Sequence, residues 1–492
     1  MKKKYIIFSI VTLVLLVSFL SYSKYLKTAN GCKEGDVKPT KITKGISMNL
    51  EQTAGAGDYK TVTQSEWPTE GYKFNTELSR CENGSELNWD DTKKAVIMQG
   101  NVSDKCYVYF DIFIPKIPDV CNSRDILADC IKKYGDNGSA ISNIYIHNSS
   151  LANGAGDNSY RYAGGDYVLT DAGKATGATM MIGYNKTVTT SLIDFYCNGT
   201  KQYVGYGCSS SQAHYYLIKG DTTQYQTYNE ALNTSVEKGY LTKDNVKNFV
   251  CFGTDASLCP TENLYRIIGV FNNQVKLVKW DYAKSSLLGT DGDFSQEYTS
   301  NYFSGEQGES PSSNSLYYWN NAGTNTWSES NLNKINLNTN FVNNIGTIWA
   351  KKIATTTWKV GGGSYANIVT SVPKTAYQYE VGSSASSTTV DKKIGLMYVS
   401  DYGFAADLSG WTTKLDSYSS NNSKNWLFLG STEWTISRSS DYSYDAFGVT
   451  STGGVLYTNV TRSFAVRPSF NLESSVNYVS GSGSMSDPVR VN

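Results

Sequence analysis

Histidine and proline are scarce in this chain, and neither sign of charge is in excess. The 492 residues include 2 His and 9 Pro, and 44 Lys and Arg balance 44 Asp and Glu. A balanced charge argues against a nucleic-acid partner, because proteins that bind nucleic acid normally carry a basic excess. With only His147 and His214 available, most histidine-rich metal sites are excluded and little remains for serine-hydrolase chemistry. We therefore expect no nucleic-acid partner and no cofactor.

Tyrosine, glycine and apolar side chains are plentiful. The chain has 37 Tyr and 43 Gly, and 40% of its residues are hydrophobic. This apolar content is enough for folded cores and excludes wholesale disorder. Aromatic residues favour strands and glycines favour turns, so the composition indicates a strand-rich surface protein rather than a helical bundle. The predicted fold class is α+β and mostly β.

A long apolar run lies near the start of the chain. Residues 5–22 carry no charge and follow three lysines. As a helix this run is roughly 27 Å long, which is enough to cross a hydrocarbon core. Residues 1–27 are therefore predicted to be a signal anchor in the cell membrane, single-pass, with the C-terminal bulk of the chain extracellular. A cleaved signal peptide is the alternative, although Ser21-Tyr22-Ser23 is a poor cleavage site. Residues 28–45 are interpreted as a stalk.

Cysteine is absent after Cys259, and after Cys32 the others fall in sequence-local pairs. In an exported chain such pairs predict a disulfide framework. Pairing of neighbours predicts these bridges, with Cys32 left over: Cys81–Cys106, Cys121–Cys130, Cys197–Cys208 and Cys251–Cys259. A metal site would need spacing of the C-x-x-C type, which the chain lacks, so no metal is expected.

The patterning predicts three units after the stalk. Residues 46–113 read as a small β-sandwich-like module, in which the predicted strands are 72–75, 95–98 and 106–110. Residues 114–260 read as an irregular α+β region that contains disulfides. Two helices are predicted there, one over 126–134 with a left-handed stop at Gly135 and a shorter one over 242–249.

Residues 261–492 form the third predicted unit, a mixed domain of many strands and few helices. A hairpin is expected over 264–270 and 274–278, joined at 271–273. One or two short helices are expected after Ser328. The further predicted strands are 394–399, 434–437, 446–449, 455–460, 464–472 and a final strand near 489–491.

Several motifs in this third unit occur in a characteristic order. They are Trp434-x-Ile436-Ser437-Arg438, Ala446-x-x-Val449, Gly453-Gly454-Val455 and Val466-Arg467-Pro468-Ser469-Phe470-x-Leu472, with Asn263 to Gly269 before them and Ser480-Gly481-Ser482-Gly483 after. This order resembles an uncharacterised surface-protein domain of Gram-positive bacteria, which is distantly similar to C-type-lectin-like and formylglycine-generating-enzyme-like folds. The stretch Cys81 to Asp111 looks like a small module often placed before that domain.

The resemblance implies a lectin-like binding domain over 261–492, and the chain departs from its relatives in two ways. A formylglycine-generating enzyme needs a cysteine pair that this domain lacks. Calcium-dependent sugar binding uses a proline-centred loop and a Trp-Asn-Asp segment, whereas this chain has only Trp319-Asn320-Asn321. The formylglycine-generating activity is therefore not expected, and calcium binding is left open by the sequence.

The polar and charged motifs mostly favour structural roles. Both histidines lack the partners of a catalytic base, Asp291-Gly292-Asp293 departs from a calcium loop, and Gly361-Gly362-Gly363 lacks the lysine of a phosphate loop. Trp434 and Phe470 are predicted core residues, and Arg467 is predicted to be drawn inward as a hydrogen-bond hub.

The best candidate binding surface combines segment 439–445 with segment 457–459. Tyr, Ser, Asn and Asp offer flat apolar area and adaptable hydrogen bonds at small entropic cost. The predicted ligand-binding residues are Tyr442, Tyr444, Asp445, Tyr457 and Asn459, and an ordinary tyrosine-rich solvated surface is the alternative interpretation.

The favoured hypothesis is an anchored cell-surface adhesion protein that is not an enzyme and that binds a glycan or protein ligand through this surface. A self-associating structural envelope protein is the first alternative. A surface carbohydrate-active enzyme is the second, with Asp401, Asp441 and Asp445 as candidate carboxylates.

Overall fold

The computed structural model describes residues 46–52, 56–63, 71–90, 93, 95–100, 104–113, 115–182, 188–202, 208, 211–243, 245–299 and 313–492. The fold is mixed α+β and mostly β, with 23% helix and 33% strand. The predicted anchor and stalk, residues 1–45, lie outside the described residues. Within the described residues, no helix is both long enough and apolar enough to cross a membrane. The chain divides into two compact units, Met1–Pro115 and Lys116–Asn492.

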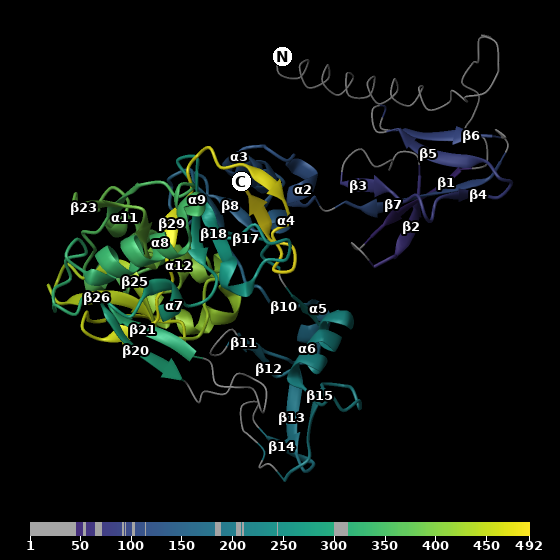
Figure 1. Ribbon diagram of the computed structural model, residues 1–492. Coiled ribbons are helices and arrows are strands. Elements are labelled where there is room, and N and C mark those ends of the chain that lie inside the picture. The colour runs from purple at the N-terminus through teal and green to yellow at the C-terminus, as the bar shows by residue number, and fades with distance from the viewer. Residues whose placement is uncertain are drawn as a thin grey trace, which may run out of the picture. The chain divides into compact units, whose positions relative to one another are not determined.

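The first unit is a small sheet covered by a hairpin (Figure 1). Its strands are β1 (Ile46–Glu51), β2 (Tyr59–Val62), β3 (Tyr72–Phe74), β4 (Arg80–Cys81), β5 (Glu86–Asp90), β6 (Ala95–Gln99) and β7 (Cys106–Ile112). The sheet order is β2-β1-β7-β3, with β4 also paired to β7, while β5 and β6 pair with each other. Trp89 of the hairpin packs against Phe74 and Phe110 of the sheet. The three predicted strands of this module are confirmed.

The second unit is built on a large sheet that draws strands from both ends of its sequence. The order is β24-β29-β19-β18-β17-β31-β30, and β9 pairs with β18 and with β8. These strands are β8 (Ile144–Ile146), β9 (Tyr160–Tyr162), β17 (Phe249–Cys251), β18 (Leu264–Phe271), β19 (Gln274–Lys279), β24 (Ile394–Gly395), β29 (Ser469–Asn471), β30 (Tyr478–Ser480) and β31 (Val489–Val491). Both β18 and β19 are buried along nearly their whole length.

Smaller sheets and short helices surround the large sheet. The remaining strands of this part are β20 (Phe294–Thr299), β21 (Ser313–Tyr318), β22 (Thr356–Lys359), β23 (Thr389–Lys392), β25 (Glu433–Arg438), β26 (Asp445–Val449), β27 (Val455–Asn459) and β28 (Ser463–Phe464). The helical segments are α2 (Ile117–Val120), α3 (Leu127–Gly135), α4 (Ser139–Ser142), η4 (Thr261–Asn263), α7 (Ser285–Leu288), η5 (Leu332–Phe341), α8 (Val342–Asn344), α9 (Thr347–Ala350), α10 (Tyr365–Ile368), α11 (Pro373–Glu380), α12 (Val399–Phe404), η6 (Leu408–Thr412) and η7 (Leu415–Lys424).

Residues 167–242 have a hydrophobic cluster of their own. Its elements are β10 (Val168–Leu169), α5 (Asp171–Ala175), β11 (Met180–Ile182), β12 (Val188–Thr190), β13 (Ile193–Cys197), β14 (Thr200–Gln202), β15 (His214–Ile218), α6 (Tyr228–Glu237) and β16 (Leu241–Thr242). Helix α6 lies alongside β13 and β15 (Figure 1). Thr227 and Glu230 form a capping box that starts α6.

The hairpin of β18 and β19 and helix α3 follow the local sequence closely. Asn272 and Asn273 join β18 to β19 with positive φ angles of 48° and 63°, the conformation that tight hairpin turns require. The helix predicted over 126–134 is α3, one residue shifted. Its last residue, Gly135, is helical rather than a left-handed stop. A Cβ there would lie 3.0 Å from Ile144, so glycine at 135 allows close packing.

Three sequence predictions need correction. The helix expected over 242–249 is absent from the described residues of that segment, because Phe249 pairs with Arg266 as part of β17. The strand expected over 394–399 ends at Gly395, and Val399 begins α12. The strand expected over 464–472 is split into β28 and β29.

The predicted boundary at residue 260 does not separate two compact units. Strand β17 pairs with β18 on one side and with β31 on the other, and β9 pairs with β18 at Gly269 and Val270. Residues 114–260 and 261–492 therefore share one sheet. They also share one core, which includes Ile144, Val250 and Phe252.

We predict that a fragment of residues 261–492 does not fold, whereas a fragment of residues 116–492 does. The shorter fragment lacks Ile144, Val250 and Phe252, each of which stabilises the core by about 1.5–3 kcal/mol. Their sum is comparable with the whole stability of a domain, about 5–15 kcal/mol. Circular dichroism with thermal unfolding measures both fragments. A cooperative transition in the shorter fragment at the temperature of the longer one would contradict the shared sheet.

Candidate functional site

Four exposed tyrosines from three segments of the second unit gather into one surface patch. Tyr365 begins α10, Tyr442 and Tyr444 lie in the loop between β25 and β26, and Tyr457 is in β27. Their exposed fractions are 38%, 46%, 46% and 39%. We call these four residues the tyrosine cluster. Its rings contact one another, so the patch offers continuous aromatic surface.

Each ring of the tyrosine cluster lies against at least one other ring of the cluster. The centroids of Tyr365 and Tyr457 are 4.9 Å apart, and those of Tyr442 and Tyr444 are 5.6 Å apart. Tyr442 and Tyr457 are nearly parallel, with an interplanar angle of 13° and a centroid separation of 6.4 Å. None of the four hydroxyl groups hydrogen-bonds to another described residue. These hydroxyl groups are therefore available to a ligand.

A buried amide positions the loop that carries Tyr442 and Tyr444. Asn325 is 1% exposed, and its Nδ2 donates to the carbonyl oxygens of Ser439, Tyr442 and Asp445, each at 2.8 Å. Its Oδ1 accepts from Nη1 of Arg438. One side chain thus satisfies several backbone groups that the loop would otherwise bury without partners.

The glycine-rich segment before α10 brings Tyr365 to the same loop. Gly362 has a φ of 68°, and a Cβ there would lie 1.8 Å from the carbonyl oxygen of Arg438. Only glycine permits this approach. The backbone N–H of Ser440 donates to Gly363, and that of Tyr365 donates to the carboxylate of Asp441. Segment 361–363 therefore holds Tyr365 against segment 438–441.

Asp445 and Asn459, the other two predicted ligand-binding residues, lie beside the cluster, and neither is fully exposed. They are direct partners in the pairing of β26 with β27, and strand alternation places Asn459 on the same face as Tyr457. Asp445 is only 6% exposed, and burial raises the pKa of its carboxyl group. Among the described residues its carboxylate has no hydrogen-bond or ion-pair partner. Asn459 uses its Oδ1 to accept from Thr461.

Three of the four clustered tyrosines were among the predicted ligand-binding residues, whereas Tyr365 and Asn325 were not singled out from the sequence. Both residues are distant in sequence from the 439–445 loop that they contact, and neither belongs to a motif. The run Gly361-Gly362-Gly363 before Tyr365 was the available signal of a close approach.

The three residues predicted as structural are buried. Trp434 is 1% exposed and donates to the carbonyl of Tyr317, and Phe470 is fully buried in β29. Arg467 is 2% exposed. Its Nε and Nη2 bind both carboxylate oxygens of Glu433 at 2.7 Å, and Nη2 also donates to Leu427. Arg467 therefore makes the hydrogen-bond hub predicted from sequence.

The two histidines are placed in different surroundings. His147 is fully buried against Phe404 and Trp411, and its Nδ1 accepts from the N–H of Ala155. Burial, together with the charge of Arg161, lowers the pKa of His147 to about 2. His147 is therefore neutral under physiological conditions. His214 pairs with Cys197 in the β13–β15 sheet.

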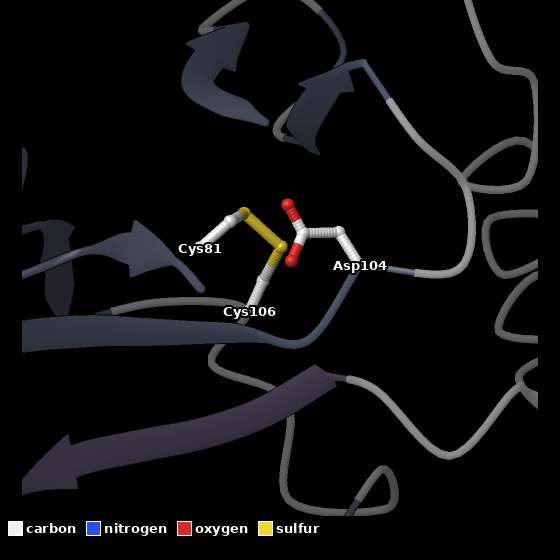
Figure 2. A group of neighbouring side chains, drawn as sticks. All are labelled: Cys81, Asp104 and Cys106. Carbon is white, nitrogen blue, oxygen red and sulfur yellow. A yellow bond between two sulfur atoms is a disulfide. The ribbon is translucent and has the colours of Figure 1, made fainter. Parts of the chain in front are cut away.

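The possible metal ligands have other roles. Cys81, Asp104 and Cys106 lie together, but the two sulfurs are joined in a disulfide (Figure 2). Burial alone would raise the pKa of Asp104, but hydrogen bonds from Ser85 and Asn83 lower this pKa to about 2. A disulfide offers no thiolate, so this group does not suit a metal. Asp293 accepts from the N–H groups of Asn321 and Leu332 and so fixes a turn.

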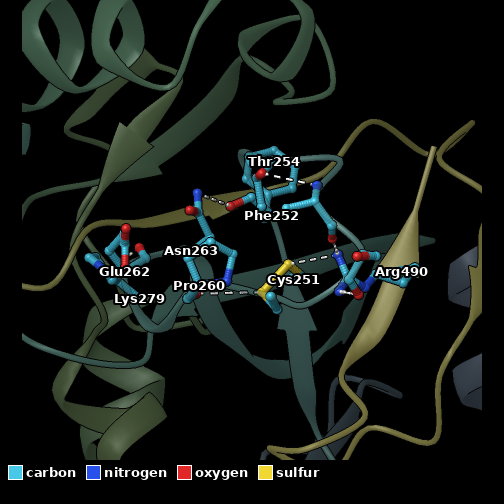
Figure 3. Close-up of a disulfide and its surroundings, with 11 residues drawn as sticks. Cys251, Phe252, Thr254, Pro260, Glu262, Asn263, Lys279 and Arg490 are labelled. Atoms are coloured by element: carbon cyan, nitrogen blue, oxygen red, sulfur yellow. Dashed lines mark hydrogen bonds between the residues drawn. A yellow bond between two sulfur atoms is a disulfide. The ribbon is translucent and has the colours of Figure 1, made fainter.

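The disulfides follow the neighbour pairing predicted from sequence: Cys81–Cys106, Cys121–Cys130, Cys197–Cys208 and Cys251–Cys259. Figure 3 shows the last of them beside Arg490. Arg490 donates to Sγ of Cys251 and to the carbonyl oxygens of Ala256 and Ser257. The loop closed by this bridge is thereby tied to β31.

The described residues also line two shallow depressions near α3, with volumes of about 390 and 460 Å³. Both are lined mainly by charged and polar side chains, including Lys132 and Tyr160. Neither of these two depressions contains residues of the tyrosine cluster.

Comparison with known proteins finds no matching family model, no matching curated protein and no matching solved structure. The resemblance to a Gram-positive surface domain therefore stays a prediction.

We predict that Asn325→Ala destabilises the loop that carries Tyr442 and Tyr444. The substitution leaves buried carbonyl groups unpaired, at a cost of about 1–3 kcal/mol in the free energy of unfolding. Hydrogen exchange should increase over residues 439–445, and denaturant unfolding gives the stability. Asn321→Ala is the control, because Asn321 is exposed. Equal exchange in the two variants would rule out this role for Asn325.

We predict that Arg467→Met lowers the free energy of unfolding by about 3–5 kcal/mol, because it strands the buried carboxylate of Glu433. The double variant Arg467→Met with Glu433→Leu removes that charge and should regain part of the loss. Urea unfolding of the single and double variants tests this. Strictly additive losses would show that the two side chains are not coupled.

Proposed function

We propose that this chain is a membrane-anchored cell-surface binding protein that recognises a glycan or protein ligand through the tyrosine cluster. One observation carries the proposal: Tyr365, Tyr442, Tyr444 and Tyr457 are exposed yet packed ring against ring. Contiguous exposed apolar patches often mark interaction sites. Tyrosine combines large contact area with few rotatable bonds, so little entropy is lost on binding.

A glycan suits the chemistry of this surface best. Sugar rings present apolar C–H faces, which stack on tyrosine rings, and hydroxyl groups, which need donors and acceptors. The tyrosine hydroxyls supply both, and the carboxylate of Asp445 is an acceptor without a partner among the described residues. Among the described residues, the Asn459 side chain makes hydrogen bonds only through its Oδ1, so its amide N–H groups are available to a ligand.

The proposed location is the cell membrane, with residues 5–22 as the single span and the remainder extracellular. Four disulfides support an oxidising compartment. The proposal includes no enzymatic activity. Of the three candidate carboxylates, Asp401 is 3% exposed, and Asp441 is engaged with the N–H of Tyr365.

Self-association of the chain as an envelope component is the second candidate function. Exposed apolar side chains outside the cluster favour it, including Leu258 at 81% and Ile348 at 69% exposure. Sedimentation of residues 28–492 tests this candidate, which requires association that increases with concentration.

We predict that replacing Tyr442, Tyr444 and Tyr457 by Ala weakens ligand binding roughly 30-fold or more, because truncated hot-spot residues cost about 2 kcal/mol or more. Each exposed substitution should change the free energy of unfolding by about 0.5 kcal/mol or less. The oxidised fragment 28–492 would be screened on an array of glycans, cell-wall fragments and host mucus, with calcium and with chelator.

Tyr298→Ala is the matched control, because Tyr298 is 43% exposed and lies outside the cluster. Saturable binding that the triple variant loses and the control keeps would support the proposal. Binding that survives the triple substitution would show that the ligand uses another surface.

A further inference from the structure

The core of the second unit contains a group of buried charged side chains that ligand binding does not use. Lys276 comes from β19, Asp401 from α12, Glu380 from the end of α11 and Arg161 from β9. Their exposed fractions are 5%, 3%, 2% and 2%. Nζ of Lys276 lies 2.5 Å from Oδ2 of Asp401. Buried charges of this kind are costly unless every polar atom is satisfied.

The surroundings of Lys276 do not satisfy an ammonium group. Among the described residues, the single hydrogen-bond acceptor of Nζ is Asp401, although an ammonium has three N–H donors. The rings of Tyr398, Trp358 and Phe271 lie 4.7, 5.4 and 5.7 Å from Nζ and compensate the charge only in part. Burial lowers the pKa of Lys276, while Asp401 opposes this shift and Arg161 adds to it. A neutral amine therefore suits the site.

The groups around Asp401 suit attack by that amine on its carboxyl carbon. Nη1 of Arg161 lies 3.7 Å from Oδ1, and the backbone N–H of Tyr398 donates to Oδ2 at 2.9 Å. A cation beside Oδ1 polarises the carboxyl group and stabilises the oxyanion that forms during attack. Oδ2, which touches the lysine, is the oxygen that can leave.

Glu380 is a second buried carboxyl group at the start of α12. It accepts from the N–H groups of Val399 and Ser400, immediately after the amide that binds Asp401. Burial raises the pKa of Glu380 to about 7, although hydrogen bonds from Ser437 and Ser400 oppose the shift.

We propose that Lys276 and Asp401 condense spontaneously to form an isopeptide bond within the folded chain. Transfer of the lysine proton to Oδ2 gives a neutral amine and a neutral acid. Nζ then attacks Cγ, and the electrons of the carbonyl π bond move to Oδ1 beside Arg161. A proton passes from the nitrogen to Oδ2, the electrons on Oδ1 restore the C=O bond, the Cγ–Oδ2 bond breaks, and one water leaves. The products are an amide and water, so no oxidant, reductant or other reactant is needed.

The reaction also leaves the remaining buried charges balanced. It removes one positive and one negative group, while Arg161 keeps its ion pair with Asp157 at 2.7 Å. The bond would join β19 to α12 across 125 residues of sequence. A cross-link that closes so long a loop restricts the unfolded chain and opposes unfolding. The inference concerns the scaffold and does not depend on the proposed ligand.

The test is the intact mass of the full chain after reduction of its disulfides, followed by tryptic mapping. We expect the chain to be lighter than its sequence by one water, and trypsin to leave Lys276 uncut within a branched peptide that contains Asp401. A chain of full mass with a cleavable Lys276 would overturn the proposal. So would a water deficit that maps to a linear peptide, for example at Asp291-Gly292.

Variants identify the reacting groups. Lys276→Met and Asp401→Ala should have the full mass of their sequences, whereas Asp401→Asn should lose one ammonia instead of water. Lys279→Met is the matched control and should keep the water deficit. Lys279 is buried on the same strand, but its Nζ contacts a backbone carbonyl that cannot condense.

Discussion

The second unit depends on buried polar side chains that satisfy backbone groups in its loops. Regular helices and strands satisfy their own backbone, but long connections that run through a core cannot. In this unit, single buried side chains provide the hydrogen bonds that the backbone of such connections needs. Asn325 binds three carbonyl groups of the 439–445 loop, and Asn336 binds those of Leu288 and Asp291. Glu380 and Asp401 together cap the start of α12.

This constraint connects the fold to the proposed binding surface. A loop held by buried hydrogen bonds presents its side chains in one arrangement, so less conformational entropy is lost when a ligand binds. The tyrosine cluster is therefore a prearranged surface rather than a flexible one. The same use of buried polar groups brings Lys276 against Asp401 inside the core, where low polarity makes an uncharged product favourable.

Features that depend on neighbouring residues could be predicted from the sequence, and features that depend on distant partners could not. The turn at Asn272 and Asn273, helix α3 and the local disulfides each follow from a few adjacent residues. The start of α12 was predicted as a strand because the apolar run there is typical of a buried strand. The carboxylate of Glu380, which helps to cap the helix, lies 19 residues away in the sequence. For the site, Tyr442, Tyr444 and Tyr457 were found from composition. Tyr365 was missed because its contact with Asp441 spans 76 residues.

The central claim is that the tyrosine cluster is the surface that contacts a ligand, and fluorine NMR tests it most directly. The chain would be labelled with fluorotyrosine, the four cluster resonances assigned by single Tyr→Phe substitutions, and a cell-wall or mucus glycan titrated in. The account predicts that the resonances of Tyr365, Tyr442, Tyr444 and Tyr457 shift together and saturate, while that of Tyr298 stays in place. Saturable binding that leaves all four resonances unchanged would contradict it.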